Sequence, residues 1–259
     1  MWTYIVGGRR FWRRLGWVLL AACLLLCLLP PLRASWQYLL VGGARRIHPI
    51  YRVDTAERKV SLSFDACWGA ERTPEILAVL RRHGVRTTFF LVNLWLEKYP
   101  EQARQIASEG HEIGLHSATH PRFTRLTDEQ IVRELRENAR LIREITGYQP
   151  RLFRPPFGDY DDRVIILVNQ EGFIPVQWSI DSLDWKGLSA QAMLERIKKR
   201  MAPGSIILFH NNGEHTPETL DPLISHLKDA GYSIVPVSEL IYHDHYYIDL
   251  EGVQRRAAE

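Results

Sequence analysis

The chain has 259 residues, enough for one domain of barrel size or two small ones. Its 46% hydrophobic and 24% charged residues are ordinary for a globular protein and exclude a largely disordered chain. The net charge is +3, but Arg9, Arg10, Arg13 and Arg14 stand in an N-terminal stretch without acidic residues, so taking four from +3 leaves −1 for residues 33–259. Nothing in this balance indicates a face that binds nucleic acid.

The first predicted element is an apolar helix over residues 15–32, LGWVLLAACLLLCLLPPL, which is uncharged and close to the length that crosses a bilayer. The arginines before it favour a cytoplasmic end. We therefore expect residues 1–32 to anchor a single-pass protein in the cell membrane, with the rest of the chain outside. A buried core helix is a less favoured alternative. A cleaved signal peptide would instead give a secreted protein, although Leu32 stands where a small residue is preferred.

The three cysteines divide between two regions. Cys23 and Cys27 lie in the apolar segment, which leaves Cys67 alone in the exported part and excludes an intramolecular disulfide there. Two roles stay open for Cys67. Packing beside a strand end is favoured, and ligation of a metal is the alternative.

Residues 33–56 have no sustained period and contain a Gly-Gly pair and a proline, so they are expected to form a linker or stem. From residue 57 to 245, β-rich runs alternate with helical patterns. The expected strands are KVSLSF, TTFFLV, EIGL, RLF, PVQWSI, SIILF and YSIVPV, and residues 246–259 are expected to be a polar tail. Seven strands separated by helices predict a parallel α/β fold, with a barrel favoured over an open sheet.

The expected helices share a stop signal, because each ends at a glycine that tolerates a left-handed backbone. They are TPEILAVLRRHG, LEKYPEQARQIASEG, TDEQIVRELRENARLIREITG, DDRVIILVNQEG and TPETLDPLISHLKDAG. Thr127 and Gln130 have the spacing of a capping box, which gives the third helix a defined start.

Side chains capable of chemistry gather at the ends of the predicted strands. Those that follow a strand are Asp65, His116 with His120, Arg154, Asp181 with Asp184, and His210. Each strand of an α/β barrel delivers its last residues to one rim, so we expect these side chains to converge although they are far apart in the sequence.

His116 and His120 are four residues apart in HSATH, so a helical turn or tight loop can direct both imidazoles at one ion. Two imidazoles and a carboxylate would make a three-ligand zinc site with an open position for water. An obvious third ligand is missing from the sequence.

Taken singly, each motif also fits a structural role. Asp65 suits a turn, RPPFG a surface turn, DSLDW a helix-entry turn, and His210 a satisfied core histidine. Arg154 is also suited to holding Asp65, and a carboxylate such as Asp184 would raise the pKa of His210 and make it a general acid. Convergence on one rim favours an enzyme, and a serine hydrolase is disfavoured because no G-x-S-x-G motif occurs.

In order and spacing, SFD, HSATH, RPPFG, DSLDW and LFH resemble the five motifs of the NodB-homology polysaccharide deacetylases of carbohydrate esterase family four, over about residues 57–240. The resemblance implies a distorted (β/α) barrel that removes acetyl groups from N-acetylated sugars with a divalent metal, usually zinc. The partners then expected are an acetylated glycan and the membrane, with no nucleic acid and no obligate protein partner. Neither the glycan nor the metal is fixed by the sequence.

The resemblance also implies residue roles. Asp65 resembles the general base, Arg154 the residue that orients it, and His210 the general acid tuned by Asp184. The metal ligands implied are His116 and His120, and the substrate contacts are Phe157, Trp185 and Leu208.

One position departs from the family pattern. Where the family has a second aspartate that binds the metal, this chain has Ala66, so Ala66→Asp is expected to tighten zinc binding. The alternative function is a weak or inactive membrane-anchored protein that still binds glycan. The FDxxWG form resembles the sporulation-associated branch of Gram-positive deacetylases.

Overall fold

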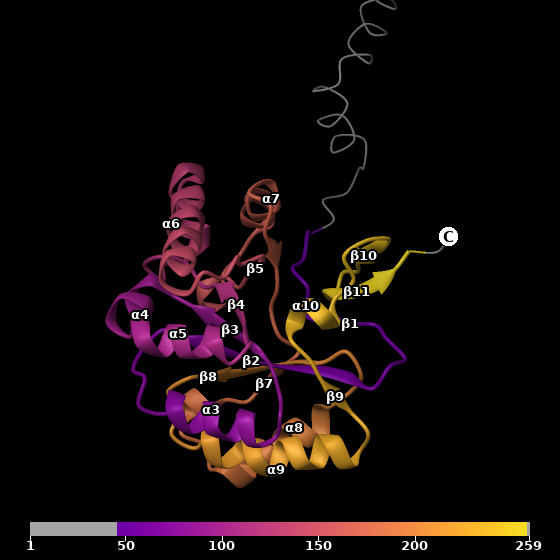
Figure 1. Ribbon diagram of the computed structural model, residues 1–259. Coiled ribbons are helices and arrows are strands. Elements are labelled where there is room, and N and C mark those ends of the chain that lie inside the picture. The colour runs from indigo at the N-terminus through magenta and orange to yellow at the C-terminus, as the bar shows by residue number, and fades with distance from the viewer. Residues whose placement is uncertain (1–45, 258–259) are drawn as a thin grey trace, which may run out of the picture. The chain divides into compact units, whose positions relative to one another are not determined.

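Strand β2 (Lys59–Ala66) lies at the centre of the main sheet in the computed structural model, which describes residues 46–257 (Figure 1). The sheet has the order β6-β5-β4-β3-β2-β8-β7, with β9 also pairing β2, and all of these pairs are parallel. The remaining strands are β3 (Thr88–Leu91), β4 (Glu112–Leu115), β5 (Leu152–Phe153), β6 (Ile174–Pro175), β7 (Ile180–Asp181), β8 (Ile206–His210) and β9 (Ser233–Ile234). The predicted parallel α/β fold is confirmed, as a distorted half-barrel.

The predicted strand PVQWSI is two short strands instead of one. β6 ends at Pro175 and β7 begins at Ile180, and these two strands form opposite edges of the sheet. Between them the chain crosses from one edge to the other, and the N–H of Gln177 donates to the Ile50 carbonyl at 2.7 Å. One extended run cannot pair at both edges of the sheet, so the predicted strand is interrupted between Pro175 and Ile180.

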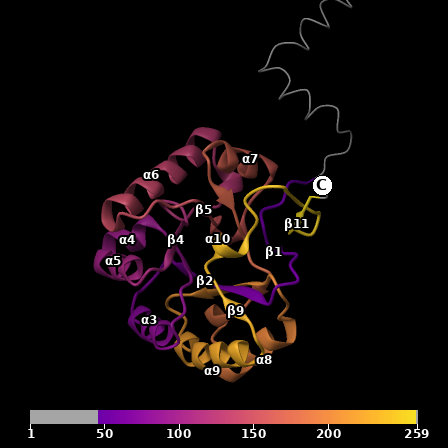
Figure 2. The same ribbon diagram turned by 45° about the vertical axis from the view of Figure 1, so that its right-hand side comes forward.

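Helices surround the strands, as Figure 2 shows. They are α3 (Thr73–Arg82), α4 (Asn93–Lys98), α5 (Pro100–Ser108), α6 (Asp128–Thr146), α7 (Asp162–Gln170), α8 (Ala190–Arg200), α9 (Thr216–Asp229) and the short α10 (Val237–Leu240). The capping box predicted for α6 is confirmed, because the Gln130 N–H donates to Thr127 Oγ1 and the Thr127 N–H donates to Gln130 Oε1. Gly147 ends the same helix at φ 72°.

Two helical segments differ from the prediction. LEKYPEQARQIASEG contributes to two helices because Pro100, which has no N–H to donate, begins α5 directly after α4. Helix α8 was not predicted. Its signals are Ser189, whose side chain accepts from the Ala192 N–H at 3.3 Å, and the apolar positions Met193 and Ile197.

The alternation of β2 separates two apolar layers. Leu62, Phe64 and Ala66 belong to the layer between the sheet and the helices, where the ring of Phe64 stacks on that of Phe89 at 4.9 Å. Phe90 belongs to the smaller layer inside the half-barrel. Fully burying a side chain such as Phe64 contributes about 1.5–3 kcal/mol. Because the even residues of β2 face the helices and side chains alternate along a strand, the odd residues of β2 face the interior of the half-barrel.

The described part of the expected polar tail, residues 246–257, contains two strands. Residues 246–259 contain β10 (Tyr246–Ile248) and β11 (Val253–Arg256), and β11 pairs with β10 and with β1 (Arg52–Val53), so the end of the expected linker also joins the fold. Polar residues here bond one another: fully buried Gln254 binds the backbone of Tyr242, and Arg255 pairs with Asp249. Composition suggested a solvated tail because these partners are not visible in the sequence.

The predicted membrane segment, residues 15–32, and residues 33–45 of the expected linker lie outside the described residues, as do Cys23 and Cys27. Among residues 46–257, no helix is both long enough and apolar enough to cross a bilayer.

Candidate active site

The carboxyl ends of the strands open into a cavity of about 840 Å³, a volume typical of ligand pockets. The predicted site residues that line it are Asp65, His116, His120, Phe157, Asp184, Trp185, Leu208 and His210. The one predicted site residue that does not line the cavity is Arg154, which lies fully buried behind Asp65. The structure thus brings together the side chains that the five motifs contribute.

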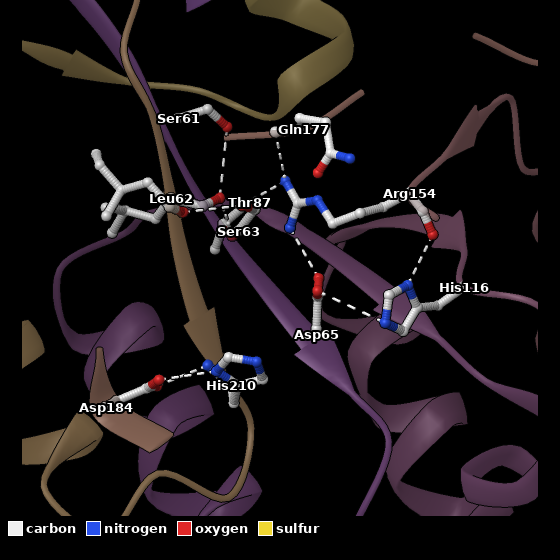
Figure 3. Close-up of polar contacts among 11 residues, drawn as sticks. Ser61, Leu62, Ser63, Asp65, Thr87, His116, Arg154, Gln177, Asp184 and His210 are labelled. Atoms are coloured by element: carbon white, nitrogen blue, oxygen red, sulfur yellow. Dashed lines mark hydrogen bonds and ion pairs between the residues drawn. The ribbon is translucent and has the colours of Figure 1, made fainter. Parts of the chain in front are cut away.

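Asp65 is the last inward-facing residue of β2 and is 5% exposed. Arg154 Nη1 donates to Asp65 Oδ1 at 2.7 Å, and Nη2 donates to Ser63 Oγ and to the Gln177 carbonyl, each at 3.0 Å (Figure 3). The guanidinium also lies over the Phe90 ring, 4.1 Å from its centroid. Held on several sides, Arg154 fixes the direction of the carboxylate.

The charges around Asp65 decide its protonation. Burial raises the pKa of Asp65, but the opposite charge of Arg154 outweighs burial and leaves the pKa below its ordinary value. The carboxylate is therefore ionised at neutral pH. Its second oxygen, Oδ2, lies 3.6 Å from His116 Nε2.

His116 follows β4 and has a fixed ring. Its Nδ1–H donates to the Arg154 carbonyl at 2.8 Å, and its backbone N–H donates to Asn138 Oδ1 at 2.9 Å. Burial lowers the pKa of His116, so the ring is neutral at pH 7 and Nε2 is left with a lone pair facing Asp65. Such an imidazole is prepared to bind a cation.

The HSATH segment is a tight loop rather than a helical turn. Ser117 and His120 have positive φ values of 75° and 57°, and Glu134 on α6 accepts from the N–H groups of Ala118 and Thr119 at 2.8 Å each. These bonds hold an unfavourable backbone in place.

The ring of His120 packs against that of Phe157, with centroids 4.5 Å apart. Burial lowers the pKa of His120 to about 4, so this ring is also neutral at pH 7.

His210 ends β8 and is paired with a buried carboxylate. Its Nδ1–H donates to Asp184 Oδ1 at 2.8 Å and its backbone N–H to Oδ2 at 2.7 Å (Figure 3). Asp184 also accepts from the Trp185 N–H and from Thr216 Oγ1, both at 2.9 Å. Burial lowers the pKa of His210, but the hydrogen bond and charge of Asp184 outweigh it and raise the pKa above the ordinary value.

The rim of the cavity is aromatic. Trp68, Phe157 and Trp185 are 59–60% exposed and all three line the cavity, an arrangement suited to the apolar face of a sugar ring. Phe157 and Leu183 both have φ of 60°, so strained backbone occurs in the RPPFG and DSLDW motifs as well as in HSATH.

The residues present fit a divalent metal. The Cys67 sulfur and one ring nitrogen each from His116 and His120 lie within 4.8 Å of one another. Imidazole nitrogen and sulfur are donors that zinc accepts. Ala66 offers no side-chain donor, so any third protein ligand comes from elsewhere.

Several residues that line the cavity were not among the predicted site residues. Cys67 was favoured as packing, and Trp68, Arg122 and Trp178 were not proposed as site residues. Asn138 orients His116 from the middle of α6, and the signal that could have found it is its position three residues after Leu135 and four before Ile142, on the apolar face of the helix.

Comparison with known proteins agrees with this geometry. The family model described as polysaccharide deacetylase matches residues 52–176. The peptidoglycan-N-acetylglucosamine deacetylase of Bacillus cereus is 34% identical over 186 residues, which cover 70% of this chain and 68% of that protein. The peptidoglycan-N-acetylmuramic acid deacetylase PdaC of Bacillus subtilis is 31% identical over 73% of this chain, but only 40% of PdaC is covered.

Similar solved structures include one without activity. A pseudoenzyme of the CE4 family from Bacillus anthracis superposes with a TM-score of 0.72 at 31% identity, over 82% of this chain and 73% of that one. A mutant of it, described as having restored enzymatic activity, also has a TM-score of 0.72, at 33% identity over 81% of this chain and 72% of that one. The fold therefore occurs in chains with activity and in chains without it.

Proposed function

The chain belongs to the polysaccharide deacetylase family, and from this premise we propose that it hydrolyses the N-acetyl group of an amino sugar in peptidoglycan, releasing acetate. The observation that carries the proposal is the pairing of a carboxylate and an imidazole with opposite pKa shifts in one cavity. The pKa of Asp65 is lowered by the charge of Arg154 and that of His210 is raised by Asp184, and the two residues are register partners on neighbouring strands.

Asp65 serves as the general base. Arg154 holds Oδ1, which leaves Oδ2 to accept a proton from water as the water oxygen bonds to the acetamide carbon. Because the pKa of Asp65 is low, the carboxylate is ready at neutral pH. Arg154 does not touch the substrate in this scheme and acts by positioning the base.

His210 serves as the general acid. With Nδ1 bonded to Asp184, the protonated ring offers its Nε2–H to the nitrogen of the sugar amine as the C–N bond breaks. The products are acetate and an amino sugar. The raised pKa of His210 keeps this proton available near neutral pH.

A divalent cation held by His116 and His120 would polarise the amide carbonyl and lower the pKa of the attacking water. Phe157, Trp185 and Leu208 would contact the sugar around the reacting group, because they line the same cavity. Zinc is the proposed metal.

Peptidoglycan is proposed over a chitin-like glycan because the similar enzymes are named for peptidoglycan. A role in sporulation stays a prediction from the FDxxWG form. The test is incubation of the purified protein with peptidoglycan and with chitooligosaccharides, in the presence of zinc and of other divalent metals, with acetate measured. Metal-dependent acetate release that is absent in Asp65→Asn would support the proposal.

A second candidate is a protein that binds glycan without cleaving it. It is favoured by Ala66, which stands at the position of a metal-binding aspartate, and by the resemblance to a pseudoenzyme. Glycan binding without acetate release under every metal would decide for this candidate and against the hydrolase.

We also propose that residues 15–32 attach the catalytic domain to the outer side of the cell membrane. The arginines before this segment support that orientation. Protease added to intact protoplasts should digest the domain while a cytoplasmic control stays intact. Protection of both would show the reverse orientation, and a soluble chain starting near residue 34 would show cleavage.

A further inference from the structure

The two residues after Asp65 differ in their access to the cavity. Ala66 is fully buried and pairs in register with Leu91, and both belong to the apolar layer between the sheet and the helices. Cys67 packs against the same layer but also lines the cavity, whereas Ala66 does not. Cys67 directly follows β2, and the period of two along the strand, continued by one residue, gives it the side of Asp65.

Cys67 therefore lies where a ligand is needed. Its sulfur is within 4.8 Å of ring nitrogens of both His116 and His120. With Zn–S of about 2.3 Å and Zn–N of about 2.0–2.1 Å, tetrahedral ligand atoms lie roughly 3.3–3.6 Å apart, so small side-chain movements would close the shell.

The side chains around the sulfur are already held in position. His116 is fixed by its bond to the Arg154 carbonyl, and His120 packs against Phe157. Asp65 is already held by Arg154 at 2.7 Å and is left free to act as the base.

We propose that Cys67, as a thiolate, is the third protein ligand of a zinc site completed by His116 and His120. The inference deepens the proposed hydrolase and rests on it for the role of the metal. Ligation transfers the thiol proton to solvent and forms a metal–sulfur bond, with no change of oxidation state. A thiolate favours zinc and cobalt over magnesium, so the site selects soft divalent cations.

The decisive measurement is the absorption of the cobalt-substituted full-length protein. Cys23→Ser and Cys27→Ser are introduced first, so that Cys67 is the only thiol, and bound metal is removed with a chelator. Cobalt(II) should then produce a thiolate-to-metal charge-transfer band in the near ultraviolet. The band should be absent in Cys67→Ser.

A matched control moves the thiol by one position. The double variant Ala66→Cys/Cys67→Ala keeps the composition but moves the thiol to a fully buried position that does not line the cavity, so it should show no band. Circular dichroism checks that each variant is folded. A band in this control, or no band in the parent with Cys67 intact, would overturn the assignment.

Zinc titration by calorimetry gives an independent readout. Cys67→Ser should weaken zinc binding by about 10²-fold, which follows from dividing the binding energy of four-ligand zinc sites among the ligands. Ala66→Asp should not tighten it, contrary to the sequence expectation, because residue 66 is fully buried and does not line the cavity. Unchanged affinity in Cys67→Ser would refute thiolate ligation.

The assignment of Cys67 as a metal ligand and the proposed hydrolase activity can be refuted independently of each other. A charge-transfer band without acetate release would keep the metal site and remove the activity. Acetate release that is equal in Cys67→Ser and the parent would keep the activity and remove Cys67 from the metal shell.

Discussion

The two sides of the cavity use the same kind of ion pair in opposite ways. On one side the carboxylate of Asp65 faces the cavity and the cation Arg154 lies behind it. On the other side the imidazole of His210 faces the cavity, and Asp184, fully satisfied by hydrogen bonds, holds it from behind. In each pair, the less exposed member shifts the pKa of the other.

The choice of hidden partner explains the difference in chemistry. Arginine does not lose its proton in proteins, so it holds the pKa of Asp65 below the ordinary value. A carboxylate behind histidine favours the imidazolium, so it raises the pKa of His210. One cavity thereby contains a base and an acid that do not neutralise each other.

The largest expected effect comes from removing the base. Asp65→Asn should lower acetate release by about 10²–10⁴-fold, because the amide cannot accept a proton from water. His210→Gln is the matched change on the other side. In the pH profile of kcat/KM, the first variant should lose the acidic limb and the second the alkaline limb. Retention of both limbs in either variant would contradict the assigned roles.

The second effect is on stability. Arg154→Met leaves the buried charge of Asp65 without its counter-ion and should destabilise the fold by about 3–5 kcal/mol at neutral pH, measured by denaturant unfolding. The pKa of Asp65 is depressed in the folded parent, so this pair stabilises the parent above the ordinary aspartate pKa and stops doing so as the pH falls through the folded value. The difference in the free energy of unfolding between the parent and Arg154→Met should therefore become smaller as the pH falls.

Asp65→Asn in the Arg154→Met background serves as the control for this measurement. It should recover most of the lost stability, because no buried charge then lacks a partner. An equal deficit in the single and double variants would show that packing of Arg154, and not its charge, is what matters.

A smaller effect on activity is expected when Asp184, which holds the general acid, is replaced. Asp184→Asn should move the alkaline limb of kcat/KM to lower pH, because the pKa of His210 is raised chiefly by Asp184 against burial. The proton-bearing form of His210 exists below its pKa, so a lower pKa means that activity is lost earlier as the pH rises. Asp181→Asn, which removes a weaker influence, should move the limb less. The reverse order would be inconsistent with the geometry.

The smallest effect concerns the aromatic rim. Trp185→Ala should raise KM roughly 2- to 10-fold with little change in kcat, because stacking on the sugar contributes equally before and during the reaction. Leu250→Ala is a control at another exposed apolar residue, 65% exposed in the turn between β10 and β11. It should change neither constant. A fall in kcat for Trp185→Ala would instead place the ring at the reacting atoms.

Local signals in the sequence predicted much of this fold. Thr127, Gln130 and Gly147 bound α6 through contacts within a few residues, and such contacts are visible in the sequence. The break in PVQWSI and the pairing of β11 with β1 depend on residues about 125 to 200 positions away, at Ile50 and in β1. Those partners cannot be read from a local pattern.

By itself, the sequence determined that the side chains of the five motifs gather at the carboxyl ends of the strands, because a parallel α/β fold carries the residue after each strand to one rim. Only the tertiary structure decided how they work together. It placed Arg154 behind Asp65, gave Cys67 but not Ala66 access to the cavity, and put the sulfur near the two imidazoles. The physical reason is that pKa values and ligand geometry depend on distance and burial, and spacing along the chain does not specify either one.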